Sequence, residues 1–159
     1  MAVTRNLTPG QRPYNDAGYL EMMTMVIFMG GLSRQVVENK WDGFLNAFDG
    51  FAPAKVADFT AEDVERLSED ARIVRNSAKI NAVVKNARTM VDIANEHATF
   101  GQWLRNKLQS EGVDATCKAL AQKFSYVSEN SALRYLYAVG EDVGDVSDKV
   151  IKKYGARPA

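Results

Sequence analysis

Apolar and polar positions recur with helical spacing along almost the whole chain. Residues 19–29 are nearly all apolar, which predicts a buried helix, and Gly30-Gly31 would end it. Later segments carry apolar residues on one face only, as amphipathic helices do. No convincing period-two alternation, the mark of a half-buried strand, occurs. The pattern predicts an all-α fold of short helices joined by short loops.

Capping residues, glycines and prolines predict where the helices begin. A residue such as Ser33 can accept a hydrogen bond from a free backbone N–H, and Pro53 can open a short helix. Within the later helices we expect Leu133 and Ile151 to face inward with the other apolar residues. The predicted helices begin at or after Ser33, Pro53, Thr60, Asn76-Ser77, Thr99 or Gly101, Asp114, Ser128 and Asp145.

Length and composition predict one domain. A chain of 159 residues can bury one core without disulfides or metal, and we expect a flexible tail at 1–12 and a single domain at 13–159. The single Cys117 excludes an intrachain disulfide and suits a reducing cytoplasm. The N-terminus has no signal-peptide pattern, and no apolar run could span a bilayer. We expect a monomer without membrane contact.

Charge is balanced overall but not locally. The chain has 20 Lys+Arg and 20 Asp+Glu, yet no acidic residue lies between Asp70 and Asp92. The second half of this stretch has the apolar stripe of an amphipathic helix starting near Asn76-Ser77. The five cations of the stretch are Arg72, Arg75, Lys79, Lys85 and Arg88.

Two interpretations of this cationic stretch are open. A helix start is partially positive and prefers acids, so Arg75 and Lys79 make sense there if a phosphate binds the free N–H groups between them. Alternatively, the cations form a solvated face or pair with the acidic residues before the stretch. Charge alone favours the second interpretation, because charge runs are usually solvated.

Few residues point to catalysis directly. His97 is the only histidine, and neither a zinc-ligand spacing nor a glycine-rich phosphate loop is present. Cys117 is best interpreted as a buried inert thiol, and Trp41 as a core residue. Glu21 lies in the most apolar helix, where a carboxylate is costly unless paired. It is either a salt-bridged residue at the helix edge or a carboxylate lining a pocket.

Several segments, taken together and in order, resemble one known family. YLEM is followed by GGLS and FDGFAPAKVA, and then by AEDVERLSEDARIVRNSAKINAVVKNAR, TFGQWL and FSYVSENSALRYLYAVG. In this order they resemble the bacterial DNA-3-methyladenine glycosylase I family of the helix-hairpin-helix DNA glycosylases. The resemblance covers roughly residues 19–140. It implies an all-α domain with a helix-hairpin-helix motif that binds double-stranded DNA.

The resemblance gives the cationic stretch a role. It implies that residues 75–79 form the hairpin whose backbone N–H groups hold one DNA strand. Many related glycosylases have glycines at such a turn, and this chain has none there. The DNA-binding residues that the resemblance implies are Arg72, Arg75, Asn76, Ser77, Lys79 and Lys85.

The chain departs from the family at the base pocket. Val26 stands at the position of the family's pocket glutamate, Arg34 replaces the tryptophan after GLS, and Met29 replaces a glutamine. The pocket implied for this chain consists of these three residues with Ser33 and Trp41. The identity of the bound base therefore does not carry over from the family.

The family's zinc ligands near both termini also lack counterparts. YND resembles the family's YHD, but Asn15 stands where a ligand histidine would be, and no His or Cys follows Gly140. We therefore expect no metal, and we expect no other cofactor.

Loss of the pocket glutamate does not by itself exclude catalysis. The positive charge of an alkylated purine weakens its glycosidic bond, so an enzyme must mainly flip the nucleotide, hold the base and admit water. A carboxylate would add electrostatic stabilisation. The candidates for a catalytic role are Glu21, Tyr14 and Glu38, with Asp16 as a further carboxylate.

Three functions follow, in order of preference. The first is a DNA repair N-glycosylase that excises a damaged base, best interpreted as an alkylated purine. The second is a non-catalytic DNA-binding module derived from the same family, which Val26 and Arg34 favour. The third is a helical protein-interaction domain that does not bind DNA.

Overall fold

The computed structural model describes residues 10–154, and within them every regular element is helical. The all-α prediction is confirmed. The α-helices are α1 Asp16–Met29, α2 Arg34–Asn39, α3 Trp41–Ala47, α4 Pro53–Ala57, α5 Ala61–Ser68, α6 Ser77–His97, α7 Phe100–Glu111, α8 Val113–Lys123, α9 Glu129–Ala138 and α10 Asp148–Tyr154, and a 3-10 turn, η1, covers Asp49–Phe51.

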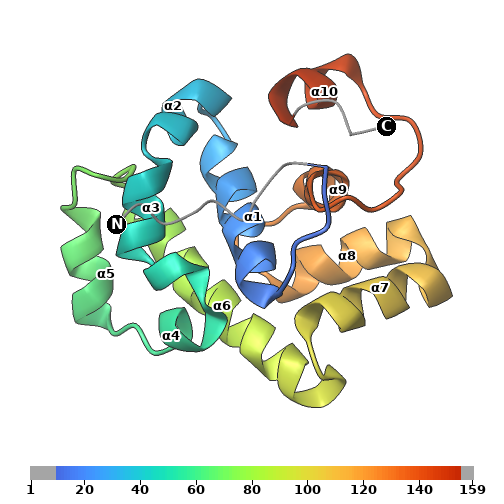
Figure 1. Ribbon diagram of the computed structural model, residues 1–159, viewed down its shortest axis with the longest axis horizontal. Coiled ribbons are helices and arrows are strands. Elements are labelled where there is room, and N and C mark those ends of the chain that lie inside the picture. The colour runs from blue at the N-terminus through green and yellow to red at the C-terminus, as the bar shows by residue number, and fades with distance from the viewer. Residues whose placement is uncertain (1–9, 155–159) are drawn as a thin grey trace.

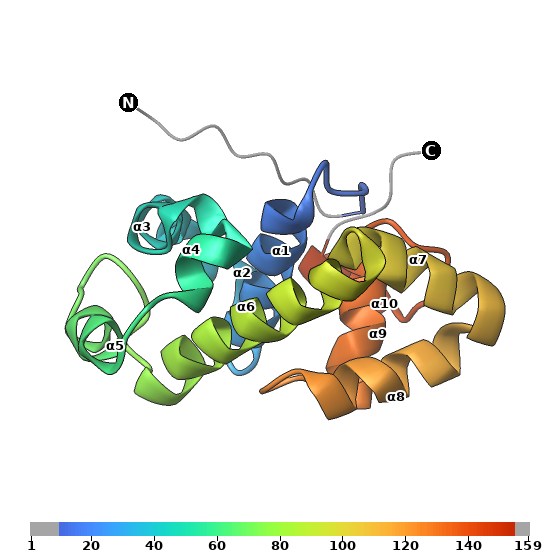
Figure 2. The ribbon, with the colours of Figure 1, turned by 90° about the horizontal axis from the view of Figure 1, so that it is seen from below.

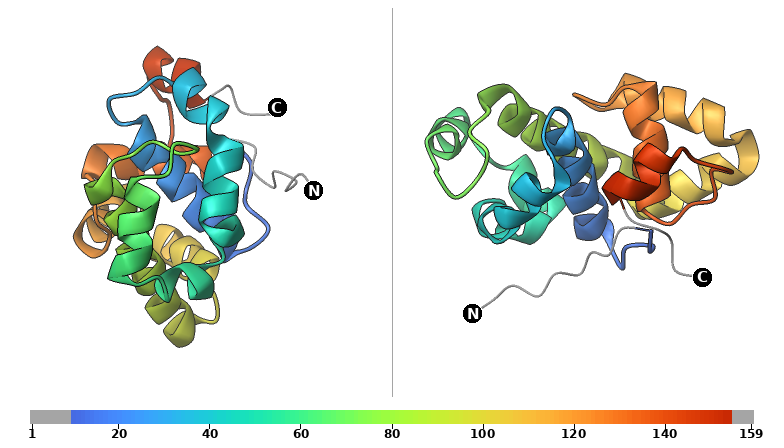
Figure 3. Two further views of the ribbon diagram at one scale, coloured as in Figure 1. Left: turned by 90° about the vertical axis from the view of Figure 1, so that its left-hand side faces the viewer. Right: turned by 90° about the horizontal axis from the view of Figure 1, so that it is seen from above.

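Helix α1 lies at the centre of the molecule (Figure 1). Helices α2 to α5 lie on one side of it and α7 to α9 on the other, and the long α6 crosses α1 and joins the two groups (Figure 2). Helix α10 returns to lie beside the end of α1 that leads into α2 (Figure 3). The end of α1 at Met29 is therefore where α2, α6 and α10 meet, since Lys79 of α6 and Lys153 of α10 both bond to it.

The predicted helix starts are largely confirmed. Ser33, Thr60, Asn76, Thr99 and Ser128 each cap a helix, because each side chain accepts a hydrogen bond from a backbone N–H of the first turn. At Thr60 the bond is reciprocal, since Asp63 accepts from the Thr60 N–H at 2.8 Å. Local capping chemistry is therefore enough to locate most elements of this chain.

Some details of the predicted helices are wrong. The helix expected after Ser33 is broken at Lys40, whose backbone leaves the helical conformation between α2 and α3. Leu133 and Ile151 do not face inward, because their side chains are 37% and 38% exposed. Both lie at the margin of an apolar stripe, where periodicity alone does not separate core from surface.

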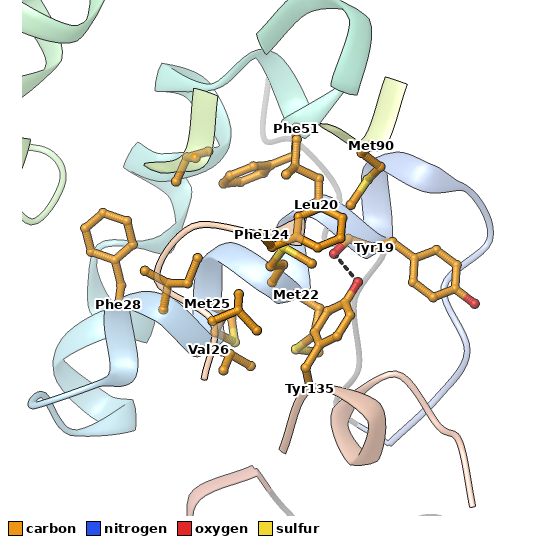
Figure 4. Close-up of a cluster of buried hydrophobic side chains, with 14 of the residues drawn as sticks. Tyr19, Leu20, Met22, Met25, Val26, Phe28, Phe51, Met90, Phe124 and Tyr135 are labelled. Carbon is orange, nitrogen blue, oxygen red and sulfur yellow. Dashed lines mark hydrogen bonds between the residues drawn. The ribbon is translucent and has the colours of Figure 1, made fainter. Parts of the chain in front are cut away.

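The core surrounds α1, which is buried on all sides from Gly18 onward. Figure 4 shows Met22, Met25, Val26 and Phe28 of this helix among side chains from other elements. The Tyr135 hydroxyl donates to the Tyr19 carbonyl oxygen at 2.8 Å, which joins α9 to α1. Because a helix that is apolar all round needs neighbours on every side, its sequence explains its central place.

The beginning of the domain is held against the end of α9. The Gly10 N–H donates to the Ala138 carbonyl at 2.7 Å, and Arg12 pairs with Glu141 at 3.5 Å. Residues 1–9, most of the predicted tail, lie outside the described residues. Over the described part of the chain, none of the helices has the length and apolarity needed to cross a membrane.

Candidate functional site

The turn between α5 and α6 leads into a helix start that is open to solvent. Asn76 caps α6 by accepting from the Lys79 N–H at 3.1 Å, and Ser77 and Ala78 are exposed. The N–H groups of these first helical residues have no acceptor within the helix. The helix start thus has the geometry in which a phosphate could bind, without glycine at the turn.

Arg72, one of the predicted DNA-binding cations, is paired within the protein. Its Nη2 lies 2.7 Å from Asp70 Oδ2, and its Nη1 donates to Asn46 at 3.0 Å. The hydrogen bonds from Arg72 lower the pKa of Asp70 to about 2, so Asp70 stays ionised and neutralises Arg72 at neutral pH. The turn is also fixed against α3, where only a glycine at 43 leaves room for the Arg72 carbonyl.

Lys79 and Arg88 also bond to other parts of the protein. Lys79 Nζ donates to the Gly30 carbonyl at 2.8 Å, and burial lowers the pKa of this lysine. Arg88 donates to the carbonyls of Ala57 and Phe59, both at 2.9 Å. Of the predicted cations, Arg75 and Lys85 are exposed and form no ion pair within the described residues.

The residues predicted to form the base pocket do not come together around one cavity. Val26, Met29 and Trp41 are buried in the core, at 6%, 0% and 1% exposure. Ser33, which caps α2, and Arg34 instead line a surface cavity. A base at Val26 would need space that the core side chains fill in this structure.

The catalytic candidates occupy different surroundings. Glu21 is buried, with 3% exposure, and accepts a hydrogen bond from the Trp41 indole at 2.7 Å, so it is not a helix-edge residue. Tyr14 is 92% exposed. Glu38 lines the same surface cavity as Arg34 and forms an ion pair with it at 2.8 Å. Glu38 thus borders a surface cavity, whereas Glu21 is enclosed in the core.

The YND segment has a structural role. Asn15 caps α1 by accepting from the Gly18 N–H, and both carboxylate oxygens of Asp16 accept backbone N–H bonds from the start of α7. Across residues 10–154, no three His, Cys, Asp or Glu side chains are grouped as metal ligands. Cys117 is buried, and burial raises the pKa of its thiol. Asn15, at the position where the resemblance implies a zinc-ligand histidine, thus serves as a helix cap.

A surface cavity lined by α2 and α10 was not predicted from the sequence. It has a volume of about 650 Å³ and lies between the start of α2 and one face of α10. Its signal in the sequence is the DKVIKKY segment, in which three lysines fall on one side of a helix. The residues lining it are Leu32, Ser33, Arg34, Gln35, Glu38, Lys149, Lys152 and Lys153.

A second helical hairpin lies on the other side of α1. Helices α8 and α9 are joined by residues 124–128, and Ser128 caps α9. Tyr126 in this turn has a positive φ of 61° and is 56% exposed. The 124–128 turn therefore also leads into an exposed helix start, as the 69–76 turn does.

Comparisons with known proteins agree with this architecture. The family model described as methyladenine glycosylase matches residues 8–135. The chain is 38% identical over 89 residues to DNA-3-methyladenine glycosylase 1 of Escherichia coli, which is 55% of this chain and 48% of that protein. It is 30% identical over 79 residues to DNA-3-methyladenine glycosylase of Haemophilus influenzae, which is 50% of this chain and 43% of that protein. The chain thus spans about half the length of the curated relatives it matches.

A solved structure extends the likeness to the fold. The 3-methyladenine DNA glycosylase I of Staphylococcus aureus superposes with a TM-score of 0.75, covering 85% of this chain and 81% of that one at 23% identity. The fold defines an all-α protein of helical hairpins packed around a central buried helix. Because the family model covers most of the chain, the chain belongs to the methyladenine glycosylase family.

Proposed function

We propose that this protein binds double-stranded DNA and removes an alkylated purine base from it. The observation that carries the proposal is the family match over residues 8–135, which includes the central helix α1, the α5–α6 hairpin with its turn, and the α8–α9 hairpin as far as residue 135. The curated relatives in that family bear the name of 3-methyladenine glycosylases.

The proposed reaction needs little chemical activation of the base by the protein. The alkylated purine is already a cationic leaving group, so water can replace it at the sugar carbon, with release of the free base, once the nucleotide is flipped out of the stack. The exposed start of α6, with Arg75 beside it and Ser77 as its first residue, supports the contact with phosphate. Lys85 adds a further exposed cation on the same helix.

Release of base from alkylated duplex DNA tests the proposal. With protein in excess over a duplex carrying 3-methyladenine, we expect release of free base well above the spontaneous rate, measured by chromatography of the products. A matched duplex without damage should release nothing. Absence of release above the spontaneous rate, from protein shown to bind the same duplex, would remove the enzymatic proposal.

One observation favours a second candidate, a family member that binds DNA without excising a base. Val26, which by the resemblance stands at the position of the family's pocket glutamate, lies within the core, and Glu38 is paired with Arg34. A cationic base would have to displace Arg34 to approach Glu38. This candidate predicts salt-sensitive duplex binding without base loss, so the same assay separates it from the first.

A further inference from the structure

The cavity between α2 and α10 is strongly cationic, and no predicted role covers the lysines on its α10 side. Its lining includes Arg34, Lys149, Lys152 and Lys153 but only one acid, Glu38. Because Glu38 and Arg34 neutralise each other at 2.8 Å, three lysines remain without a counter-charge in the cavity. Such a surface attracts an anion.

The lysines of α10 have no acidic partner among the described residues. No ion pair within 4.0 Å involves Lys149, Lys152 or Lys153, although Asp145 and Asp148 lie just before them in the chain. Burial, with the nearby charges of Arg134 and Lys79, lowers the pKa of Lys153. A bound anion near Lys153 would favour its charged form.

The position of the lysines is fixed by the fold. Tyr154 at the end of α10 is buried, at 2% exposure, and Lys153 Nζ donates to the Met29 carbonyl at the end of α1, 2.6 Å away. Lys79 of α6 bonds to the next carbonyl, Gly30, at 2.8 Å. Thus α10 and the start of α6 are both tied to the end of α1, and the exposed Lys149 and Lys152 of α10 line the cavity shared with α2.

The positive charge of the cavity also indicates whether it would bind the base or the phosphates of a DNA duplex. An alkylated purine is cationic and would be repelled by three uncompensated lysines, whereas phosphodiesters carry one negative charge each. The cavity is open and lies on the surface, which suits a backbone running across it rather than a base enclosed in it.

We infer that Lys149 and Lys152 of α10 bind the phosphate backbone of double-stranded DNA, next to the strand contacts at the start of α6. The inference rests on the proposed function for the presence of DNA, and it adds a contact surface formed by the last helix. It assigns the cavity to phosphate and not to the base.

Binding of an undamaged duplex at several salt concentrations tests the inference. For the double variant Lys149→Gln/Lys152→Gln we expect roughly tenfold weaker binding near 0.1 M salt. The slope of log K against log salt concentration should be shallower by about 1.8, since each phosphate that a lysine neutralises adds about 0.9 to the slope. Both lysines are exposed, so the variant should fold normally, which circular dichroism checks.

A matched control removes the same charge elsewhere. Lys55 on α4 and Lys118 on α8 are exposed, form no ion pair within the described residues and lie outside the cavity lining, so Lys55→Gln/Lys118→Gln should keep the wild-type affinity and slope. If both double variants lose the same affinity and slope, the effect is one of net charge, and the inference is wrong.

The outcomes separate the inference from the proposed function. If the wild-type protein binds no duplex, DNA binding as a whole fails. If the wild type binds and the α10 variant binds equally well, the α10 contact fails while the proposed function stands. A further arm uses vesicles containing phosphatidylserine. A loss confined to vesicle binding would assign the lysines to a lipid surface and overturn the inference.

Discussion

At the scale of single residues, Glu21 shows how a buried carboxylate can be structural. Trp41 donates its indole N–H to Glu21 at 2.7 Å, and the Trp41 ring stacks on Phe44 and Phe51. We predict that Trp41→Phe lowers the free energy of unfolding by about 3 kcal/mol, because Glu21 loses this donor in the core and the smaller ring leaves space. Urea unfolding followed by circular dichroism measures the loss.

Trp103→Phe is the control for ring size. Trp103 is also buried, at 8% exposure, but its indole donates to no carboxylate in the described residues. Trp103→Phe should therefore lower the free energy of unfolding by about 1–2 kcal/mol less than Trp41→Phe does. Equal losses in the two variants would show that the hydrogen bond to Glu21 contributes nothing. Glu21 would then again be a candidate for a catalytic role.

At the scale of elements, Asp16 joins the start of α1 to the start of α7. Its Oδ2 accepts from the Phe100 N–H at 2.8 Å and its Oδ1 from the Gly101 N–H at 3.1 Å. A carboxylate at a helix start satisfies free N–H groups and interacts favourably with the helix dipole. We predict that Asp16→Ala costs about 1–2 kcal/mol of unfolding free energy, measured by urea unfolding at pH 7.

Two further variants test that explanation. Asp16→Asn keeps one acceptor oxygen but loses the charge, and it should cost less than the alanine variant. Asp114→Ala removes an exposed acid from the first turn of α8 that accepts no N–H bond in the described residues, and it should cost under about 0.5 kcal/mol. A loss at Asp114 as large as that at Asp16 would contradict a specific role for the two bonds.

At the scale of the whole molecule, the sequence predicts the helices better than the site. The caps at Thr60 and Asn76 are local features, so reasoning from the sequence finds them. The partners of Lys79 and Arg88 are carbonyl groups 49 and 31 residues away in the chain. No local pattern shows that these cations are held within the protein, and only packing places α10 beside α2.

The placement of α10 leads to a last prediction, about cooperativity. Helix α10 is short and lies at the edge of the fold, where it is anchored by Tyr154, which is 2% exposed, and by the Lys153 bond to Met29. We expect Tyr154→Ala to release α10 while the rest stays folded, because the core around α1 does not depend on it. Amide hydrogen exchange should show loss of protection over residues 148–154 with protection kept in α1, α6 and α9. Duplex affinity should fall as in the lysine variant, although every lysine is present. Ile151→Ala, at a side chain 38% exposed, should change neither the amide protection of residues 148–154 nor the affinity for the duplex. Loss of protection throughout α1 would mean instead that α10 belongs to the cooperative core.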